Sequence, residues 1–201
     1  MPKIVGSSIQ EHREHIRRKL FAALSELMAV NNFEDISLSD IAHKAGVGRT
    51  AVYNHFADKE SLLLGYIHDE THRYVDQLRK NLIGVNDPVD RLRIYVRAQV
   101  QLRRDFHMPS GPELRTVMSK TTREKLRDHA ILVEEILRSI IMLGIATNVF
   151  PRQDIASTIM MVNCCLSSRS LPAHAVANKK TAVCIEEFIL RAVGTPPTRI
   201  A

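Results

Sequence analysis

The sequence predicts an all-α fold, and three observations lead to this prediction. Apolar residues recur at three- and four-residue spacing along almost all of the 201 residues, which is the period of a helix with one buried face. No segment alternates apolar and polar residues as a half-buried strand would. Prolines and glycines fall between the periodic segments, where breaks between helices are expected. We expect about nine helices, with a smaller N-terminal domain over residues 1–60, which begins with a short N-terminal arm, and a larger helical domain over residues 61–201.

The first two helices are indicated by an apolar stripe and by residues that favour helix ends. Asn31 and Asn32 are expected to end the first helix, because asparagine tolerates the left-handed conformation of a helix end. Ser37 is expected to cap the second helix, with Asp40 three residues later in the spacing of a capping box. The stripe of the first helix consists of Ile16, Leu20, Ala23, Leu24, Leu27 and Met28.

A sharp turn and two more helices follow. Residues 45–48, Ala-Gly-Val-Gly, form the turn, and a short third helix carries Val52 and Phe56 on its apolar side. Asp58 is expected to cap a long fourth helix, with Glu60 in its first turn.

Prolines and glycines mark the remaining boundaries. They predict a fifth helix over roughly 88–106, a short helix, a long helix over roughly 121–146 and two final helices. The breaks are expected at Gly84, Pro88, Pro109, Gly111, Pro112, Pro151, Pro172 and Pro196-Pro197.

Composition narrows the class of protein. The hydrophobic content of 45% and the charged content of 25% are ordinary for a soluble globular chain. No apolar run approaches the roughly 20 residues that span a bilayer, and the first residues, MPKIVGSSIQEHREH, contain no apolar segment of a secretory signal. We therefore expect a cytoplasmic protein with no membrane partner.

The three cysteines, Cys164, Cys165 and Cys184, do not make a disulfide framework. They lie in apolar helical stretches, where cysteine usually behaves as a small buried hydrophobe. A thiol redox sensor or a soft-metal site is the alternative, although no Cys-x-x-Cys motif supports it.

The net charge of +6 is unevenly distributed. Residues 1–60 contain eight Lys/Arg and eight Asp/Glu, whereas residues 91–127 contain ten Lys/Arg and three Asp/Glu. A high isoelectric point is therefore weak support for DNA binding here. The basic stretch 91–127 is either a solvated helix face or a surface for an anionic effector or an acidic partner.

Residues 37–56, SLSDIAHKAGVGRTAVYNHF, contain the parts of a helix-turn-helix in the right order. The second helix of such a motif lies in the major groove of DNA, where arginine reads guanine and asparagine reads adenine. Tyrosine, threonine and histidine side chains can hydrogen-bond to phosphates, and such contacts fix the register of the protein on the DNA. The alternative is a helical hairpin whose polar face is merely solvated. The outward side chains are Arg49, Thr50, Tyr53, Asn54 and His55.

Residues 16–64 resemble the DNA-binding domain of the tetracycline-repressor (TetR) family of bacterial regulators. The resemblance is carried by Asp40-Ile41-Ala42, Ala45-Gly46-Val47, the segment 52–56 (VYNHF) and the segment 58–63 (DKESLL). It implies an N-terminal helix-turn-helix domain and a C-terminal effector and dimerisation domain. It further implies a homodimer that binds a pseudo-palindromic DNA operator through paired recognition helices.

The resemblance also assigns roles to residues. Tyr53 and His55 match positions that contact phosphate, and Lys59 matches one that reaches the DNA backbone from the start of the fourth helix. Ser37 matches a capping, phosphate-contacting position. The expected DNA-binding residues are Ser37, Gly48, Arg49, Thr50, Tyr53, Asn54, His55 and Lys59.

Three positions depart from the family pattern. Gly48 stands where Ser or Thr is usual, Thr50 where Gly is common, and Asn32 where Gly is customary. The first departure removes a capping hydroxyl, and the second could alter base preference. Together they leave the operator sequence open.

The last two long helices are expected, by resemblance, to form a four-helix bundle across the dimer axis. Apolar stripes on both helices agree with this independently, and the alternative is that both stripes face the core of one protomer. The expected interface residues are Ile155, Ile159, Val162, Leu166, Cys184 and Phe188.

An effector pocket is expected among the fourth to eighth helices. The alternative for its aromatic and methionine residues is plain core. His68 and His72 have metal-ligand spacing, but two histidines on one helix face are usually solvated, so we expect no metal and no cofactor. The candidate lining residues are Tyr66, Tyr74, Tyr95, Phe106, Met118 and Met142.

Rival functions have little support in the sequence. No phosphate-cradling glycine loop, nucleophile elbow or metal motif of an enzyme is found. The family resemblance implies the expected function, which is a repressor that a small-molecule effector releases from its operator by changing the separation of the recognition helices. The alternatives are an activator and a helix-turn-helix protein that acts as a protein-interaction module.

Overall fold

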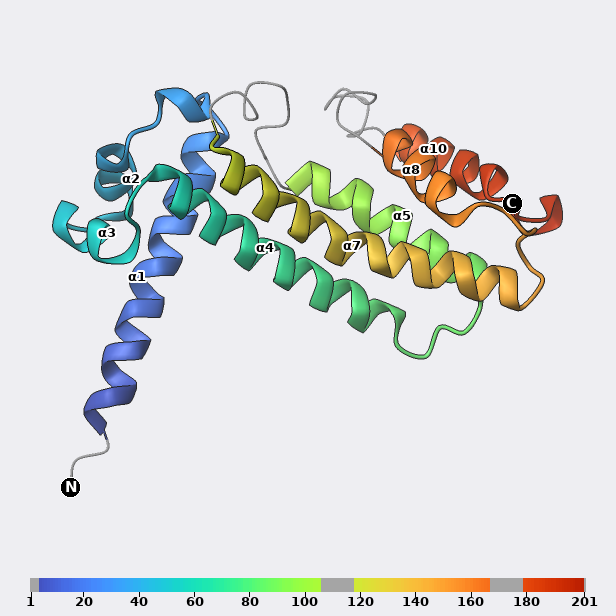
Figure 1. Ribbon diagram of the computed structural model, residues 1–201, viewed down its shortest axis with the longest axis horizontal. Helices are drawn as coiled ribbons and strands as arrows, with labels where there is room; N and C mark the ends of the chain where they lie inside the picture. The colour runs from blue at the N-terminus through green and yellow to red at the C-terminus, as the bar shows by residue number, and fades with distance from the viewer. Residues whose placement is uncertain (1–3, 106–117, 167–178, 201) are drawn as a thin grey trace. The chain divides into compact units, whose positions relative to one another are not determined.

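The computed structural model describes residues 4–105, 118–166 and 179–200. These residues form eight α-helices and two short 3₁₀ helices, with no strand among them (Figure 1). The prediction of an all-α fold is confirmed. The expected count of nine is one too high for this part of the chain, because the short helix expected after Pro112 is not among the described helices. The breaks expected at Pro109, Gly111, Pro112 and Pro172 lie outside the described residues.

The helices pack into two compact units. Within the described residues, the first unit contains residues 4–69 and 118–126, and the second contains residues 70–105 and 127–200. The helices α4 (Lys59–Leu82) and α7 (Lys120–Ala146) each contribute residues to both units.

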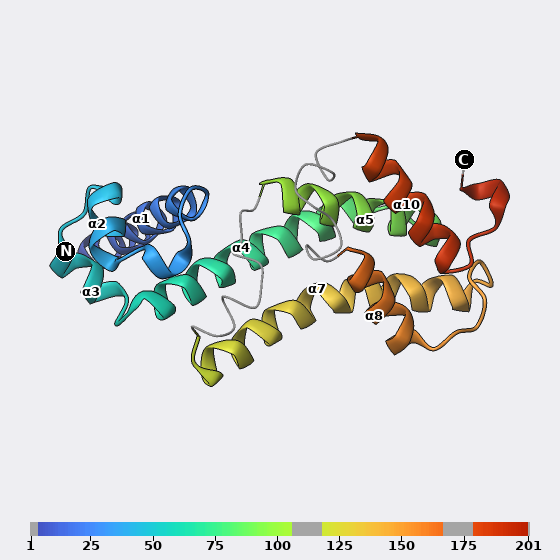
Figure 2. The same cartoon turned by 90° about the horizontal axis from the view of Figure 1, so that it is seen from above.

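The first unit is built on α1 (Ile4–Met28), which packs against α2 (Leu38–Ala45) and α3 (Arg49–His55), as Figures 1 and 2 show. The structure extends α1 well upstream of Ile16, where the apolar stripe seen in the sequence begins. Buried side chains from α1, α2, α3 and the start of α4 form its core. They include Leu20, Phe21, Leu24, Ile41, Val52, Leu62, Leu63 and Tyr66.

The second unit contains α5 (Pro88–Asp105), α8 (Ile155–Cys165) and α10 (Lys179–Ala192) together with parts of α4 and α7. The helices α5 and α10 pack side by side (Figure 2). A short 3₁₀ helix, η2 (Pro197–Arg199), follows α10. The core is aliphatic apart from two aromatic side chains, and its most buried members are Leu78, Leu92, Tyr95, Val96, Leu137, Ile140, Ile141, Phe150, Ile189 and Leu190.

A close approach ends α7. The backbone N–H groups of Val149 and Phe150 both donate to the carbonyl of Gly144, at 2.9 Å each, and Asn148 adopts a positive φ of 55°. The Phe150 ring lies directly against Gly144, so that a Cβ at Gly144 would overlap the ring. Glycine is therefore required at this position of the helix.

A buried carboxylate joins α10 to α5. Glu186 accepts a hydrogen bond from Arg93 Nη1 at 2.9 Å and two from Arg97, from Nε at 2.5 Å and from Nη2 at 2.9 Å. Arg93 also donates to the carbonyl of Arg199 at 2.6 Å, and Arg91 donates to the carbonyl of Val85 at 2.8 Å. Three cations of the basic stretch 91–127 thus have partners within the second unit.

Candidate nucleic-acid interface

A complete capping box begins α2. Asp40 N–H donates to Ser37 Oγ at 3.1 Å, and Ser37 N–H donates in return to Asp40 Oδ2 at 2.9 Å. The hydrogen bonds from Ser37 hold the pKa of the Asp40 carboxyl below its ordinary value. The predicted cap is confirmed, and it fixes where α2 starts.

The turn between α2 and α3 depends on Gly46. This residue ends α2 in the left-handed conformation, with φ of 63°, and its N–H donates to the carbonyl of His43 at 3.1 Å. Val47 N–H then donates to the carbonyl of Ala42 at 2.9 Å, which closes the turn. Gly48 occupies the N-cap of α3 without a side-chain hydrogen bond, as its lack of a hydroxyl requires.

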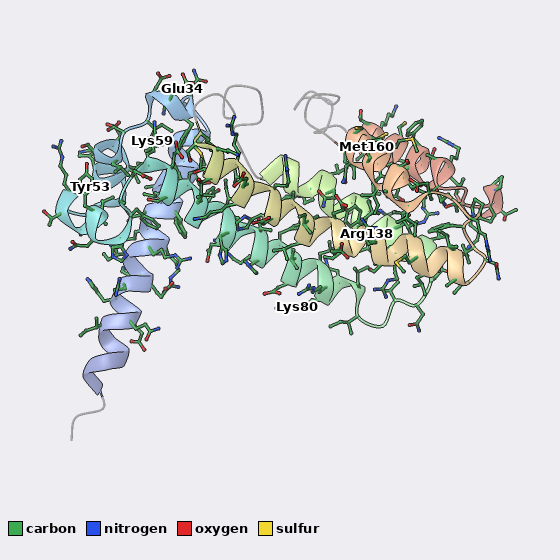
Figure 3. The ribbon with its side chains drawn as sticks, in the orientation of Figure 1. Glu34, Tyr53, Lys59, Lys80, Arg138 and Met160 are labelled. Carbon is green, nitrogen blue, oxygen red and sulfur yellow. The ribbon has the colours of Figure 1, made fainter. Side chains whose placement is uncertain are left out.

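The helix α3, called the recognition helix below, presents a polar face. Val52 is buried and anchors the helix to the unit, whereas Tyr53 is 60% exposed (Figure 3). Arg49, Thr50 and Asn54 are also exposed. Within the part of the chain that the structure describes, these four outward side chains have no hydrogen bond or ion pair that would hold them to the protein.

His55 and Phe56 end the recognition helix beside α1. The Phe56 ring lies 5.8 Å from the ring of Phe21, measured between centroids. His55 is half-buried, and burial together with the charges of Arg13, His12 and Arg17 lowers the pKa of its imidazole. Its ring is therefore neutral at neutral pH, with one N–H available as a donor.

Lys59 is held by the protein in this structure. Its Nζ donates to the carbonyls of Phe33 and Glu34, at 2.7 and 3.0 Å, and lies 4.5 Å from the centre of the Phe33 ring (Figure 3). Burial lowers the pKa of the ammonium group. Lys59 thereby fastens the start of α4 to η1 (Phe33–Asp35). A contact between Lys59 and DNA stays a prediction.

The candidate effector residues do not form one cluster. Tyr66 lies in the first unit, where its hydroxyl donates to Ser25 Oγ at 3.1 Å, and Met118 is buried in that unit too. Met142, on α7, is 53% exposed. Phe106 lies outside the described residues. Tyr74 and Tyr95 remain, and both contribute to the core of the second unit.

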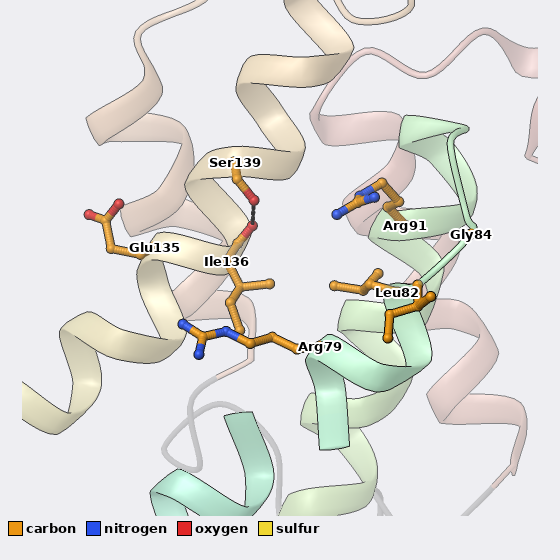
Figure 4. A pocket seen from close by; sticks show the side chains of 8 residues that line it. Arg79, Leu82, Gly84, Arg91, Glu135, Ile136 and Ser139 are labelled. Carbon is orange, nitrogen blue, oxygen red and sulfur yellow. Dashed lines mark hydrogen bonds between the residues drawn. The ribbon is translucent and has the colours of Figure 1, made fainter. Parts of the chain in front are cut away.

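Tyr74 and Tyr95 bring polar groups into an apolar core. Burial raises the pKa of both phenols well above the ordinary value. The Tyr74 hydroxyl is buried without a hydrogen-bond partner. A separate groove of about 480 Å³ at the junction of α4, α5 and α7 is lined by other residues, including Arg79, Arg91 and Ser139 (Figure 4).

The predicted dimer residues fall on two faces. Ile159, Val162 and Leu166 are buried in the core of their own protomer, and Ile155 packs against that core. Cys184 and Phe188 are exposed, with Phe188 at 55%. Three other apolar side chains on α8 and α10 are exposed but were not predicted from the sequence, namely Met160, Met161 and Val183 (Met160 is labelled in Figure 3).

Two further observations concern other classes of site. Among the described residues, no group of three or more His, Cys, Asp and Glu side chains is arranged to hold a metal ion. The described helices also include none that is long and apolar enough to cross a membrane.

Two family models match the chain. Residues 20–66 match the model for bacterial regulatory proteins of the tetR family, and residues 88–184 match the model for a tetracyclin repressor-like C-terminal domain. Between them the two models cover most of the chain, and the first includes the whole helix-turn-helix.

Sequence relatives are themselves described as transcriptional regulators. The HTH-type transcriptional regulator AlkX of Mycobacterium tuberculosis is 31% identical over 70 residues, which are 35% of this chain and 33% of AlkX. An uncharacterized HTH-type transcriptional regulator of the same species is 26% identical over 87 residues, 43% of each chain. The matched segments therefore span less than half the length of these relatives.

Solved structures share the fold over most of the chain. A tetR-family regulatory protein from Rhodococcus RHA1 has a TM-score of 0.76 at 22% identity, covering 90% of this chain and 98% of its own. The fatty acid degradation regulator FadR of Bacillus halodurans has a TM-score of 0.73 at 20% identity, with 89% and 95% covered. FadR of Bacillus subtilis, solved in complex with stearoyl-CoA, has a TM-score of 0.73 at 18% identity, with 88% and 97% covered. With its helix-turn-helix, its second helical unit and both family models in agreement, the chain belongs to the TetR family of bacterial regulatory proteins.

Proposed function

We propose that this chain is a cytoplasmic transcriptional repressor that binds a pseudo-palindromic DNA operator as a homodimer and is released by a small-molecule effector. The observation that carries the proposal is the outward face of the recognition helix. Arg49, Thr50, Tyr53 and Asn54 are exposed and have no partner within the described structure, while Val52 holds the helix in place. Such a face is available to base edges and phosphates.

The proposed roles follow the chemistry of each side chain. Arg49 and Asn54 can each make two hydrogen bonds to a base edge, to guanine and adenine respectively, and Thr50 can contact a thymine methyl group. Tyr53 and His55 donate to phosphates and fix the register of the helix in the groove. Ser37 is the remaining phosphate-contact candidate, because its hydroxyl lies at the start of α2.

The proposed dimer seam is the exposed apolar face of α8 and α10. Met160, Met161, Val183 and Phe188 are each more than half exposed. Four large apolar side chains on two adjacent helices are unusual on a surface that faces only water. A second copy of the chain would cover them in an isologous helical bundle, in which each protomer contributes the same two helices.

The proposed effector site lies in the core of the second unit, around Tyr74 and Tyr95. The buried Tyr74 hydroxyl lacks a hydrogen-bond partner, and a buried donor without a partner costs about 1–3 kcal/mol. An effector with a hydrogen-bond acceptor would satisfy this donor. Such a ligand would favour one arrangement of the unit over another only through a difference in its affinity for the two.

The experiment that tests the function is a salt titration of DNA binding by fluorescence anisotropy. Duplexes enriched from a random library by the purified protein are compared with an unrelated duplex of equal length. We expect tight binding to the enriched duplex that weakens steeply with salt. Arg49→Ala and Tyr53→Ala should each weaken it by about 1–3 kcal/mol or more while the helix content is unchanged.

One result would refute the proposed function. If enrichment yields no preferred sequence, and binding to both duplexes is weak and equal, the proposed function is refuted. Exposed Lys80 on α4 supplies a control (Figure 3). Lys80→Ala removes a charge outside the first unit and should leave the preference for the enriched duplex unchanged.

A further inference from the structure

Cations gather on α1 in the turns that precede its buried half. Residues 12–19 contain four Lys/Arg, two histidines and a single acid, Glu14. Most of these side chains are exposed, and none of them belongs to the helix-turn-helix. The part of α1 that carries them packs beside the end of the recognition helix (Figure 1).

A groove of about 540 Å³ lies between this part of α1 and the end of the recognition helix. Arg13, Glu14 and Arg17 line it from α1, and His55 and Phe56 line it from the other side. Its walls therefore combine two guanidinium groups, one imidazole and one carboxylate. Every one of these residues belongs to the first unit.

The single carboxylate does not neutralise the groove. Glu14 lies 3.8 Å from Arg17 Nη1, and Arg17 Nη2 lies 3.8 Å from Asp69. Arg17 also stacks over the ring of Phe21, 5.2 Å from its centre. Arg13 has no ion pair within the described structure, and it is exposed. The groove therefore retains an uncompensated guanidinium group beside the His55 ring.

The balanced charge of residues 1–60 does not contradict this positive field. Several of the acids are engaged in caps and ion pairs elsewhere in the unit. Asp40 accepts from Ser37, Asp58 accepts from the N–H of Ser61 at 2.7 Å, and Glu26 lies 2.8 Å from Lys44 Nζ. None of these three carboxylates lines the groove, so the formal count for residues 1–60 hides a separation of charge.

We propose that this groove is a binding site for one backbone phosphate of DNA, held by the guanidinium of Arg13 and the ring N–H of His55. A guanidinium can meet two phosphate oxygens in a planar, paired geometry, and it is the side chain best suited to this contact. The site gives α1 a DNA contact outside the helix-turn-helix. It fixes the position of the recognition helix without reading sequence.

The inference rests on the proposed function, and its test uses the number of phosphates contacted. Each phosphate that a protein neutralises contributes about 0.9 to the slope of log affinity against log salt concentration. Arg13→Gln should lower that slope by about 0.9 on the enriched duplex and on the unrelated duplex alike. Between about 50 and 200 mM salt, the variant should then lose about threefold less affinity than the original chain.

The matched control is Arg152→Gln, because Arg152 is an exposed arginine of the second unit. It should leave the slope unchanged, whereas Arg13→Lys, which keeps the charge, should restore it. A double-mutant cycle adds His55→Gln. If both side chains hold the same phosphate, the combined loss of affinity will be smaller than the product of the two single losses.

The outcomes separate the two ideas. If the original chain binds DNA with a steep slope and Arg13→Gln behaves like Arg152→Gln, the phosphate site is overturned and the proposed function stands. If the cycle is additive, Arg13 and His55 do not share a phosphate, and the site as proposed is overturned. If the original chain binds neither duplex, the proposed function fails first.

Discussion

Replacing Glu186 with glutamine keeps the size of the side chain and removes its charge. The Glu186 side chain is 7% exposed and accepts hydrogen bonds from Arg93 and Arg97. Arg93 is itself only 19% exposed. Without the carboxylate, the guanidinium of Arg93 therefore loses a buried counter-charge, while Arg97 is left near water.

The exposures of the two arginines determine how much stability each substitution should remove. Removing one partner of a buried ion pair costs about 3–5 kcal/mol, whereas an exposed pair contributes about 0–1 kcal/mol. Arg97 is 68% exposed, so its pair should contribute about as much as an exposed pair. The contribution of Arg93 should be closer to that of a buried pair. We expect a loss of about 2–3 kcal/mol for Glu186→Gln, about 2 kcal/mol for Arg93→Gln and under about 1 kcal/mol for Arg97→Gln.

Urea unfolding followed by circular dichroism measures these losses. All variants must be compared at one protein concentration, because dimerisation would make the apparent stability depend on concentration. Glu187→Gln is the control, since Glu187 is the neighbouring acid and, among the described residues, its one ion pair is with Arg191 across one helical turn, at 3.6 Å. It should change stability by no more than about 0.5 kcal/mol.

Two results would refute the reasoning. Equal losses for Arg93→Gln and Arg97→Gln would mean that exposure does not decide the worth of these pairs. A loss below about 1 kcal/mol for Glu186→Gln would mean that the buried carboxylate is dispensable. In either case the charge of residues 91–97 would have to be explained by something other than the packing of α5 on α10.

Three further predictions concern packing, pH and assembly. Gly144→Ala should destabilise the protein by about 1–3 kcal/mol in the same unfolding assay, because the new methyl group overlaps the Phe150 ring. Hydrogen bonds from Thr122 and Ser119 lower the pKa of Glu60 below its ordinary value of 4.5. The charged Glu60 therefore stabilises the fold above pH 4.5, and this stabilisation is lost as pH falls through the folded pKa. Thermal melts from about pH 6 to about pH 3 should show a smaller decrease in melting temperature for Glu60→Gln than for the original chain. Phe188→Glu should shift sedimentation from dimer to monomer at micromolar concentration without loss of helix content, and an unchanged dimer would exclude this face as the seam.

The parts of the fold that the sequence predicted well are specified locally. The capping box of Ser37 and Asp40 needs only a spacing of three residues and an extended cap residue. Gly46 sits where a helix must end in the left-handed conformation, and no other residue type adopts it as readily. The start of α1 at Ile4 was missed, because the sequence shows no apolar stripe upstream of Ile16, and residues 9–15 are exposed in the structure.

The effector residues could not be located from spacing alone. Tyr66 and Tyr74 lie two turns apart on α4, and both are apolar-face residues in the sequence. Because α4 contributes to both units, Tyr66 enters one core and Tyr74 the other. Periodicity identifies the buried face of a helix, but it does not say which neighbour covers that face.

The predicted dimer residues on α8 were difficult to choose because the helix offers too many apolar positions. The segment that forms α8, IASTIMMVNCC, is apolar on nearly all sides, so more than one stripe can be drawn through it. The stripe chosen from the sequence contains Ile159 and Val162, which face the core of the same protomer. Met160 and Met161 lie on the other face and are exposed. Under the proposed function, a second copy of the chain would cover this exposed face.

The start of α4 is held firmly within the first unit. Lys59 ties α4 to the carbonyls of η1, and Glu60 accepts a hydrogen bond of 2.7 Å from Thr122 in the first turn of α7. One turn further along, a Cβ at Gly65 would come within 2.9 Å of the Phe56 ring at the end of the recognition helix.

These contacts leave little room for α4 to move independently of the recognition helix, because close-packed groups transmit a displacement. Under the proposed function, an effector that shifts α4 or α7 would therefore move the recognition helix with it. The proposed Arg13 phosphate site lies at the far end of that helix, beside His55, and would be displaced by the same movement. Release from DNA would then follow from the loss of register at the phosphates rather than from any change in the base-reading side chains.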